Sequence, residues 1–245
     1  MTKALVLAAG LGSRIRDVAG DLPKPLMSFA GSPILAHNLR WLAGSGVTEV
    51  WVNLHYGAEM IRREIGDGQA FGLKVTYAYE PELLGTAGAL RNIAEAVTET
   101  MLVVYGDSVV RFDLSALQAR HATGGAEATV ALFDQERHLN TGIAGGRVTV
   151  SPEGAITAFV EGAGAAELSN LVNAGVYAVE PSLLDLIAPR GLVDFGRDIF
   201  PAMLRHGRRL DAHVLDEAGL CLGLDTPESH AAGQRLLSEG RLVLA

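Results

Sequence analysis

A glycine-rich stretch near the start of the chain combines residue types that bind phosphate. It reads Leu-Ala-Ala-Gly-Leu-Gly-Ser-Arg over residues 7–14 and ends an apolar run over residues 4–9. Glycines allow backbone N–H groups to approach an anion closely, and they accept a positive φ where a turn needs one. Arg14 adds a planar guanidinium that can bind two phosphate oxygens at once. The stretch therefore predicts a phosphate-binding loop at the carboxyl end of a buried strand.

A second cation follows ten residues later. Lys24 lies between two prolines, which stiffen the backbone on both sides of it. A Walker loop is excluded because it ends in Gly-Lys-Ser/Thr, and a dinucleotide-binding loop because it needs a small residue where this chain has Ile15. A lone Gly-x-Gly also occurs in ordinary strand–helix turns. The ordered combination of glycines, Arg14 and Lys24 favours a nucleotide site over such a turn.

Two more segments place polar groups after predicted strands. Glu80 follows a strand over residues 73–79 and could accept hydrogen bonds from the amino group of guanine or cytosine. Behind it, Gly85 precedes a predicted helix whose first turn has free N–H donors, and Thr86 can cap that helix. An ordinary glycine turn with a capped helix explains Gly85 and Thr86 equally well.

Asp107 directly follows a fully apolar strand over residues 101–105 and Gly106. A carboxylate at the end of a buried strand must be solvated, hydrogen-bonded or bound to a cation. Magnesium prefers one or two carboxylates together with phosphate oxygens and water. Taken alone, Asp107 could therefore be a metal ligand or a turn residue, since aspartate is common in turns.

The second half of the chain contains candidates for a second ligand. The amide of Asn173 can both donate and accept hydrogen bonds to a polar ligand, although Gly175 could simply mark a β-bulge. Asp194 either contacts substrate or stabilises the positive end of a helix. Asp225 is either a metal ligand or the cap of the last helix, which begins near Pro227.

Alternating strands and helices must position these residues. In the first half, strands are predicted over residues 4–9, 47–54, 73–79, 101–105 and 128–133, and helices over 33–43 (capped by Ser32), 58–65, 86–96 and 114–121. Strands then dominate, over residues 143–150, 155–161, 171–179, 210–215 and 220–224, with helices over 181–187, 195–204 and 227–238. The pattern predicts an α/β fold with a doubly wound, mixed, mainly parallel sheet in one domain over residues 1–245. Residues 1–135 would form a half that binds a nucleotide, and residues 136–245 a half that binds the second ligand.

Composition narrows the class of protein. The 245 residues are 49% hydrophobic and carry a net charge of −8, which argues against a nucleic-acid partner. No apolar run reaches the roughly 18 residues needed to span a membrane, and no signal peptide is visible. A single cysteine, Cys221, excludes an intramolecular disulfide and favours the reducing cytoplasm.

Taken together, the segments resemble the signature of sugar-1-phosphate nucleotidyltransferases: L-A-A-G-x-G-[ST]-R, P-K-P-L, L-G-T-A-G-A-L, G-D and N-A-G-x-Y. The resemblance implies a Rossmann-like fold and a catalytic set of Arg14, Lys24 and Asp107, with the lysine at the α-phosphate under attack and the aspartate on Mg²⁺. The nucleotide-binding residues that it implies are Leu7, Ala8, Ala9, Gly10, Gly12, Ser13, Arg14, Lys24, Glu80, Gly85, Thr86 and Ala87. The sugar-phosphate-binding residues that it implies are Gly142, Glu161, Asn173, Gly175 and Asp194.

The chain departs from this signature at two positions. The lysine that holds the sugar phosphate in many relatives is Gly162 here, and Arg190 and Arg197 are the nearest cations that could replace it. The aspartate that is a second metal ligand in relatives is Gly223 here, with Asp225 two residues further on. A strand repeats its facing every two residues, so Asp225 could reach the same metal.

The reaction implied is transfer of a nucleotidyl group from an NTP to a sugar 1-phosphate, giving an NDP-sugar and pyrophosphate. The Asp194 region and the L-G-T-A-G-A-L segment favour GTP with a mannose- or heptose-type sugar, in nucleotide-sugar biosynthesis for a bacterial cell-surface polysaccharide. Alternatives are uridylyl, thymidylyl or cytidylyl transfer to N-acetylmuramate or glucose 1-phosphate, a cytidylyltransferase for phosphocholine-like acceptors, and a non-catalytic nucleotide-sugar-binding module.

The expected partners are the two small substrates, without nucleic acid or membrane, and a homodimer is compatible with the resemblance. The chain ends shortly after Asp225, so we expect the short form without a β-helix extension.

Overall fold

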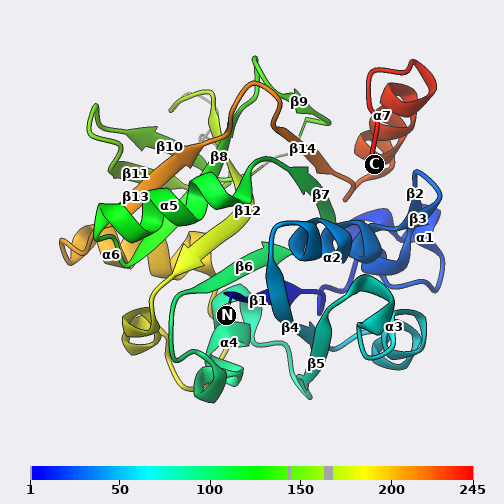
Figure 1. Ribbon diagram of the computed structural model, residues 1–245, viewed down its shortest axis with the longest axis horizontal. Helices are drawn as coiled ribbons and strands as arrows, with labels where there is room; N and C mark the ends of the chain where they lie inside the picture. The colour runs from blue at the N-terminus through cyan, green and yellow to red at the C-terminus, as the bar shows by residue number, and fades with distance from the viewer. Residues whose placement is uncertain (1, 143–144, 163–167, 245) are drawn as a thin grey trace.

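A mixed β-sheet forms the centre of the computed structural model, which describes residues 2–142, 145–162 and 168–244 (Figure 1). The sheet order is β11-β10-β12-β6-β1-β4-β5, with β8 paired to β12 and β13 paired to β8. Its strands are β1 (Thr2–Leu7), β4 (Val47–Leu54), β5 (Lys74–Tyr79), β6 (Met101–Tyr105), β8 (Ala128–Asp134), β10 (Arg147–Val150), β11 (Ile156–Val160), β12 (Leu171–Val179) and β13 (Leu210–Val214). The helices are α1 (Arg16–Ala19), α2 (Ile34–Gly44), α3 (Ala58–Ile65), α4 (Gly85–Asn92), α5 (Leu114–Gly124), α6 (Phe200–Arg205) and α7 (Pro227–Ser238).

Four neighbouring parallel strands end at the same level. β1 lies between β4 and β6, and its last residue, Leu7, pairs with Asn53 on one side and Tyr105 on the other. β5 continues the parallel set beyond β4, with Tyr79 opposite Leu54. The loops that follow these strands therefore emerge together along one edge of the sheet, where ligands bind in open α/β sheets.

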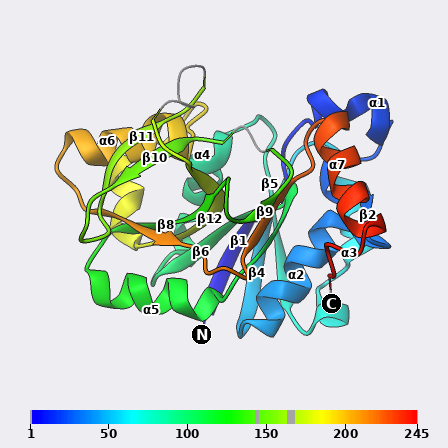
Figure 2. The ribbon, with the colours of Figure 1, turned by 90° about the horizontal axis from the view of Figure 1, so that it is seen from above.

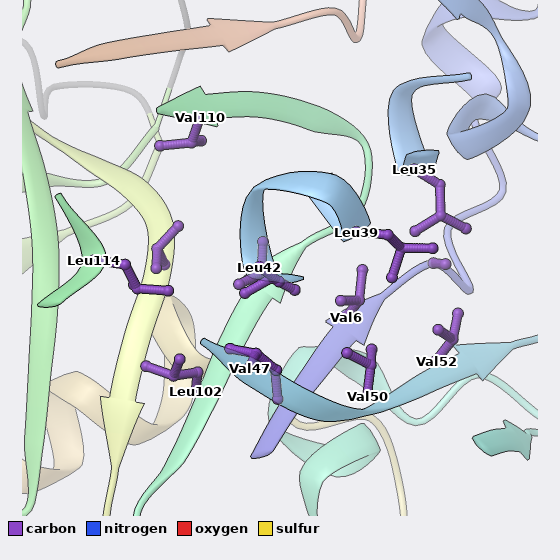
Figure 3. Packing of buried hydrophobic residues seen from close by; sticks show 14 of the residues in the cluster. Val6, Leu35, Leu39, Leu42, Val47, Val50, Val52, Leu102, Val110 and Leu114 are labelled. Carbon is purple, nitrogen blue, oxygen red and sulfur yellow. The ribbon is translucent and has the colours of Figure 1, made fainter. Parts of the chain in front are cut away.

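Helices cover both faces of the sheet, as expected for a doubly wound fold (Figure 2). Apolar residues of α2, α3 and α5 pack on one face of the sheet in one buried cluster, which Figure 3 shows around Val6, Leu39 and Val50. The other face is covered by α4 and α6 in a second cluster, which includes Leu90 and Phe200. β1 contributes Val6 to one cluster and Leu5 to the other, which explains why this strand is apolar at successive positions.

A third buried cluster supports the segment that carries Lys24. It joins Ile15 and Phe29 to Leu236 of α7 and to β7 (Ser108–Arg111) and β14 (Leu220–Gly223). β14 pairs with β7 and with β9 (Leu139–Asn140) in a small separate sheet. The C-terminal helix therefore lies against the N-terminal loop region, although the two are far apart in the sequence (Figure 2).

The predicted elements over residues 47–54, 58–65, 101–105, 171–179 and 227–238 are confirmed. The helix predicted to begin at Pro33 instead begins at Ile34, because Ser32 and Pro33 form β3 (Ser32–Pro33), which pairs with β2 (Ser28–Phe29). Ala30 and Gly31 both have positive φ at this tight hairpin turn. The segment over residues 181–187 is a 3₁₀-helix, Pro181–Leu186, and that over 195–204 begins as a π-helical turn, Phe195–Ile199. The strand predicted over residues 143–150 is observed from Arg147, and residues 143–144 lie outside the described part.

No helix within the described residues combines the length and the apolar character needed to cross a membrane.

Candidate functional site

Two adjoining cavities open at the carboxyl edge of the parallel strands. The first, of about 370 Å³, is lined by the loop over residues 7–14, by Asn53 and Glu80, and by Leu192. The second, of about 770 Å³, is lined by Glu161, Asn173 and Gly175 of the second half of the chain. The residues that line both cavities are Gly10, Leu11, Arg14, Lys24, Leu83, Thr86, Tyr105, Asp107, Asp194, Arg197 and Asp225. Two separate ligands can therefore meet along this shared wall.

Lys24 and Asp107 form an ion pair on the shared wall, with Nζ 2.7 Å from Oδ2. The lysine side chain is only 6% exposed, whereas the carboxylate is 40% exposed. A buried ammonium needs a partner or a ligand anion, because taking it out of water is costly. The pair fixes a positive charge at the boundary between the two cavities.

Two glycines allow this close arrangement. A side chain at Gly12, where φ is +60°, would have its Cβ 3.3 Å from the Cβ of Lys24. A side chain at Gly106 would meet the carbonyl oxygen of Leu7 at 2.8 Å, and the Gly106 N–H donates to that oxygen. Asp107 is thereby held directly beside the end of β1.

Arg14 and Asp225 form a second ion pair on the shared wall, at 2.6 Å. Asp225 does not cap the last helix. Thr226 is the N-cap of α7, and it exchanges hydrogen bonds with Ser229. In the register of β14 and β7, Gly223 pairs with Ser108, so Asp225 and Asp107 extend from adjacent ends of paired strands.

Glu80 is fully buried and belongs to a chain of hydrogen bonds behind the glycine loop. Its carboxylate accepts from Asn53 Nδ2 at 2.8 Å and from the Leu84 N–H at 3.2 Å. Asn53 Oδ1 in turn accepts from the Ala8 N–H at 2.7 Å. Burial raises the pKa of Glu80, and these hydrogen bonds partly oppose the rise. Glu80 therefore supports the backbone of residues 8–9 and also lines the first cavity.

The N-terminus of α4 is capped by a segment more than 100 residues away in the sequence. The Asp194 carboxylate accepts from the backbone N–H of Thr86 at 3.1 Å and from its hydroxyl at 3.2 Å. The carbonyl oxygen of Val193 accepts from Ala87 N–H and Gly88 N–H. Thr86 was expected to cap the helix through its own side chain; instead, its hydroxyl bonds to Asp194 and accepts from Phe195 N–H.

Gly85 is required for this contact. Its φ is +79°, and a Cβ there would lie 2.5 Å from the Val193 carbonyl oxygen. The glycine of the L-G-T-A-G-A-L segment thus permits one half of the chain to dock on the other. We call the contact between residues 85–88 and residues 193–195 the latch.

Asn173 and Gly175 lie where β12 departs from its regular register with β8. Gly175 has a φ of +71°, and a side chain there would meet the ring of Tyr105. Asn173 Nδ2 donates to the Tyr177 hydroxyl at 2.8 Å, and its Oδ1 accepts from Gly175 N–H. Burial raises the pKa of Tyr105 to about 12, so both tyrosine rings stay neutral. The alternative of a bulge at Gly175 agrees with this break in register, and Asn173 lines the second cavity.

Glu161 lies in the second cavity close to the π-helical turn. A side chain at Gly196 would collide with Glu161 Oε1, so the glycine allows the turn and the carboxylate to approach. Partial desolvation raises the pKa of Glu161, and the positive charge of Arg197 opposes the rise.

A comparison with known proteins agrees with this geometry. The family model described as nucleotidyl transferase matches residues 3–219. The chain belongs to the nucleotidyl transferase family.

Curated relatives of this family are similar over almost the whole chain. The mannose-1-phosphate guanylyltransferase catalytic subunit beta of Drosophila pseudoobscura pseudoobscura is 30% identical over 239 residues, which cover 96% of this chain and 62% of that protein. The UTP--glucose-1-phosphate uridylyltransferase of a Synechocystis strain is 32% identical over 218 residues, which cover 84% of this chain and 56% of that protein. The chain thus spans about three fifths of the length of these relatives.

The crystal structure of HddC from Yersinia pseudotuberculosis has the same fold. It superposes with a TM-score of 0.78 at 22% identity, covering 96% of this chain and all of that one. The nucleotidyl transferase fold predicted from the sequence, a mixed and mainly parallel sheet with helices in a single domain, is confirmed.

Most residues expected at the nucleotidyl transferase site line the two cavities. Two expected residues do not: the side chain of Ala87 is buried in the core under α4, and Gly142 is exposed near β9, where its N–H donates to Asn140. Of the two arginines suggested as replacements for the missing lysine, Arg197 lines both cavities, and Arg190 is exposed and lines neither.

Asp107 and Asp225 suit Mg²⁺ as a pair of oxygen donors. Each pairs with a cation through Oδ2. No group of three or more His, Cys, Asp or Glu suited to a metal occurs within residues 2–142, 145–162 and 168–244. Two carboxylates together with phosphate oxygens and water match the preference of Mg²⁺, so the residues fit a metal that is bound jointly with a nucleotide.

Sequence reasoning missed Asn53 and Tyr105, which both line the first cavity. Asn53 is a polar residue that follows the apolar residues 50–52 near the end of β4, and that contrast was the available signal. Tyr105 ends β6 directly before Gly106 and Asp107, but its side chain reaches the cavity only because the strand ends level with β1.

Proposed function

We propose that the chain transfers a nucleotidyl group from an NTP to a sugar 1-phosphate, releasing pyrophosphate and forming an NDP-sugar. One observation supports this most strongly: the Lys24–Asp107 pair lies on the wall shared by the two cavities. The first cavity would hold the nucleotide and the second the sugar 1-phosphate, so the reacting phosphates would meet beside Lys24. The half over about residues 1–135 would then bind mainly the nucleotide and the half over about 136–245 mainly the sugar, although residues of both halves line each cavity.

The chemistry needs positioning and charge neutralisation more than proton transfer. A sugar phosphate is already an anion at neutral pH, so its attack on the α-phosphate requires no general base. The main obstacle is repulsion between the acceptor and the triphosphate. Lys24 would stabilise the charge that develops at the α-phosphate, and Arg14 would bind the phosphates of the departing pyrophosphate.

Mg²⁺ would be held by Asp107 and Asp225 and would supply further positive charge at the phosphates. In the free protein each carboxylate is paired with a cation, so nucleotide binding must release them. The phosphates would take over Arg14 and Lys24 and leave both carboxylates to the metal. Asp225 would thus take the role of the second ligand in place of an aspartate at Gly223.

We propose GTP as the nucleotide and a mannose- or heptose-type 1-phosphate as the acceptor. Support comes from the similarity to mannose-1-phosphate guanylyltransferase. Because another relative is a UTP--glucose-1-phosphate uridylyltransferase, UTP with glucose 1-phosphate is the alternative substrate pair. The proposal includes a cytoplasmic location, a role in making a precursor of cell-surface polysaccharide, and the homodimer compatible with the family.

The test is pyrophosphate release from the purified chain with Mg²⁺. Each of GTP, UTP, dTTP, CTP and ATP is combined with the 1-phosphates of mannose, a heptose, glucose and N-acetylmuramate. We expect the highest kcat/KM with GTP and a manno-configured acceptor. A higher value with another pair would contradict the substrate assignment only, whereas no pyrophosphate release with any pair would contradict the activity and favour a binding module.

A further inference from the structure

Among the described residues, Arg197 is the cation of the site that forms no ion pair, although its positive charge acts on the nearby Glu161. The cationic side chains that line the two cavities within the described residues are Arg14, Lys24 and Arg197. Arg14 is paired with Asp225 at 2.6 Å and Lys24 with Asp107 at 2.7 Å. Arg197 has no ion pair or side-chain hydrogen bond to any other described residue, and its side chain is exposed to the cavities. Its five N–H donors are therefore available to a ligand.

The backbone that carries Arg197 is firmly anchored. Phe195 and Phe200 are fully buried on either side of it and stack at a centroid distance of 5.7 Å. The Asp194 N–H donates to the Asp198 carboxylate at 2.7 Å, and Phe195 N–H donates to Thr86 across the latch. The guanidinium thus extends from a fixed backbone position into the space that both cavities share, so binding an anion requires ordering of the side chain but not of the backbone.

The surrounding charges make this cation necessary for an anionic acceptor. Besides Asp107 and Asp225, which are each paired with a cation, the second cavity is lined by Glu161 and Asp194, whose carboxylates repel a phosphate. At the end of β11, Glu161 is followed by Gly162, which adds no cation. A phosphate could occupy this cavity only if a nearby positive charge offset the two carboxylates, and Arg197 is the one free to do so among the described residues.

We propose that Arg197 binds the phosphate of the sugar 1-phosphate and holds it against the shared wall, a role that rests on the proposed function. The sugar ring then lies toward Asn173 and Glu161, whose polar atoms suit hydroxyl groups. A guanidinium can bind two phosphate oxygens and leave the third to attack. Arg197 is thus a specificity determinant that distinguishes a phosphorylated sugar from a free one.

The test compares Arg197→Ala with Arg190→Ala, which removes an exposed arginine seven positions earlier that lines neither cavity. With GTP and mannose 1-phosphate, we expect Arg197→Ala to raise the KM for mannose 1-phosphate by roughly ten- to a hundredfold, the range for losing hydrogen bonds to a charged group. The KM for GTP should change less than about threefold, and Arg190→Ala should resemble the unaltered chain. Arg197→Lys should give an intermediate KM because it keeps the charge and loses the two-point contact.

Calorimetry with mannose 1-phosphate, free mannose and inorganic phosphate gives a second readout that needs no turnover. The unaltered chain should bind mannose 1-phosphate at least tenfold more tightly than mannose, and Arg197→Ala should lose this preference. An unchanged KM and an unchanged preference would overturn the proposal, and so would an equal rise in both KM values, which would assign Arg197 to the triphosphate. If the unaltered chain releases no pyrophosphate with any substrate pair, the proposed function fails, and the calorimetric comparison still decides whether Arg197 binds the phosphate.

Discussion

At the scale of single residues, the site consists of charges held by opposite charges. Lys24 with Asp107 and Arg14 with Asp225 keep the two cations and the two metal-ligand candidates in place before any substrate binds. Groups positioned in advance need little rearrangement when a reaction develops charge. Each pair can be tested by changing one of its members.

Lys24→Ala should lower kcat by about a hundredfold or more, because one positioned donor at a transition-state charge is worth roughly that much. The KM for the NTP should rise much less. Steady-state kinetics of pyrophosphate release would measure both. Lys74→Ala is the matched control, since Lys74 is an exposed lysine paired with Glu49 at 3.2 Å. A fall in kcat of less than tenfold would place Lys24 away from the reacting phosphate.

Asp225→Asn should raise the Mg²⁺ concentration required for half-maximal rate, and excess Mg²⁺ should partly restore turnover. Because Arg14 is 67% exposed, loss of this ion pair should change the free energy of unfolding by about 1 kcal/mol at most. Thr226→Ala removes the neighbouring helix cap and should lower stability by about 0.5–2 kcal/mol without changing the metal requirement. The same metal titration and thermal midpoint for both variants would refute the assignment of Asp225.

Glu80 should make the folded state less stable as the pH rises. Burial raises its folded pKa above the ordinary value of 4.5, so the folded state holds the proton more tightly than the unfolded chain does. The stability it contributes is present below pH 4.5 and is lost as the pH rises through the folded pKa. Glu80→Gln cannot titrate, so its stability relative to the unaltered chain should increase as the pH rises from below 4.5 through the folded pKa of Glu80. A difference that stays constant across this range, measured by urea unfolding, would contradict the expected shift.

At the scale of elements, the latch joins the two halves of the chain. The segment 193–195 supplies hydrogen-bond acceptors to the first turn of α4, in place of a cap from neighbouring residues. The same segment leads into the turn that carries Arg197. The position of α4 beside the first cavity is therefore linked to the position of Arg197 at the second.

Gly85→Ala should disrupt this contact. We expect it to lower the free energy of unfolding by about 2–4 kcal/mol, of which about 1–2 kcal/mol comes from alanine at a positive φ and the rest from the clash with Val193. Gly125→Ala is the matched control: Gly125 has a φ of +65° and would carry a Cβ in open space, so it isolates the conformational cost. Equal losses in the two variants, measured by chemical denaturation, would mean that the docking of residues 193–195 contributes nothing.

At the scale of the whole molecule, we expect the fold to form without a metal. Three buried clusters support the sheet, and the described residues contain no set of three or more metal-ligating side chains. The metal is instead expected to arrive with the nucleotide, because phosphates must first draw Arg14 and Lys24 away from the carboxylates.

EDTA should therefore abolish turnover and leave the thermal midpoint unchanged, and Mg²⁺ alone should not raise it. Mg²⁺ with GTP at a hundred times its Kd should add about 2.7 kcal/mol, or roughly 5–10 °C in a chain of this size. Thermal unfolding with each addition separately and together would measure these effects. A rise with Mg²⁺ alone would show that the protein forms a metal site without the nucleotide.

Much of the first half of the site could be predicted from the sequence. The glycine loop and Asp107 follow apolar runs, and Lys24 lies between two prolines, so each can be recognised from its neighbours in the sequence. Parallel strands then bring their carboxyl ends to one edge of the sheet. The limits of β6, β12, α3 and α7 were also predicted correctly, because their apolar patterns and flanking residues are local signals. The hairpin at residues 28–33 was missed because Ala30, which is not a typical turn residue, takes a positive φ there.

The class of fold could be inferred from residue type and short-range order alone, and these also predicted a phosphate-binding loop and the candidate carboxylates. Contacts in three dimensions were needed to choose between the alternatives that the sequence left open. Asp225 pairs with Arg14 because β14 lies beside β7, and Thr86 bonds to Asp194 because a distant segment docks at Gly85. Arg197, not Arg190, faces the cavities because the buried Phe195 and Phe200 fix the turn between them. Such contacts depend on packing between residues far apart in the chain, and a local pattern carries no information about which surfaces will meet.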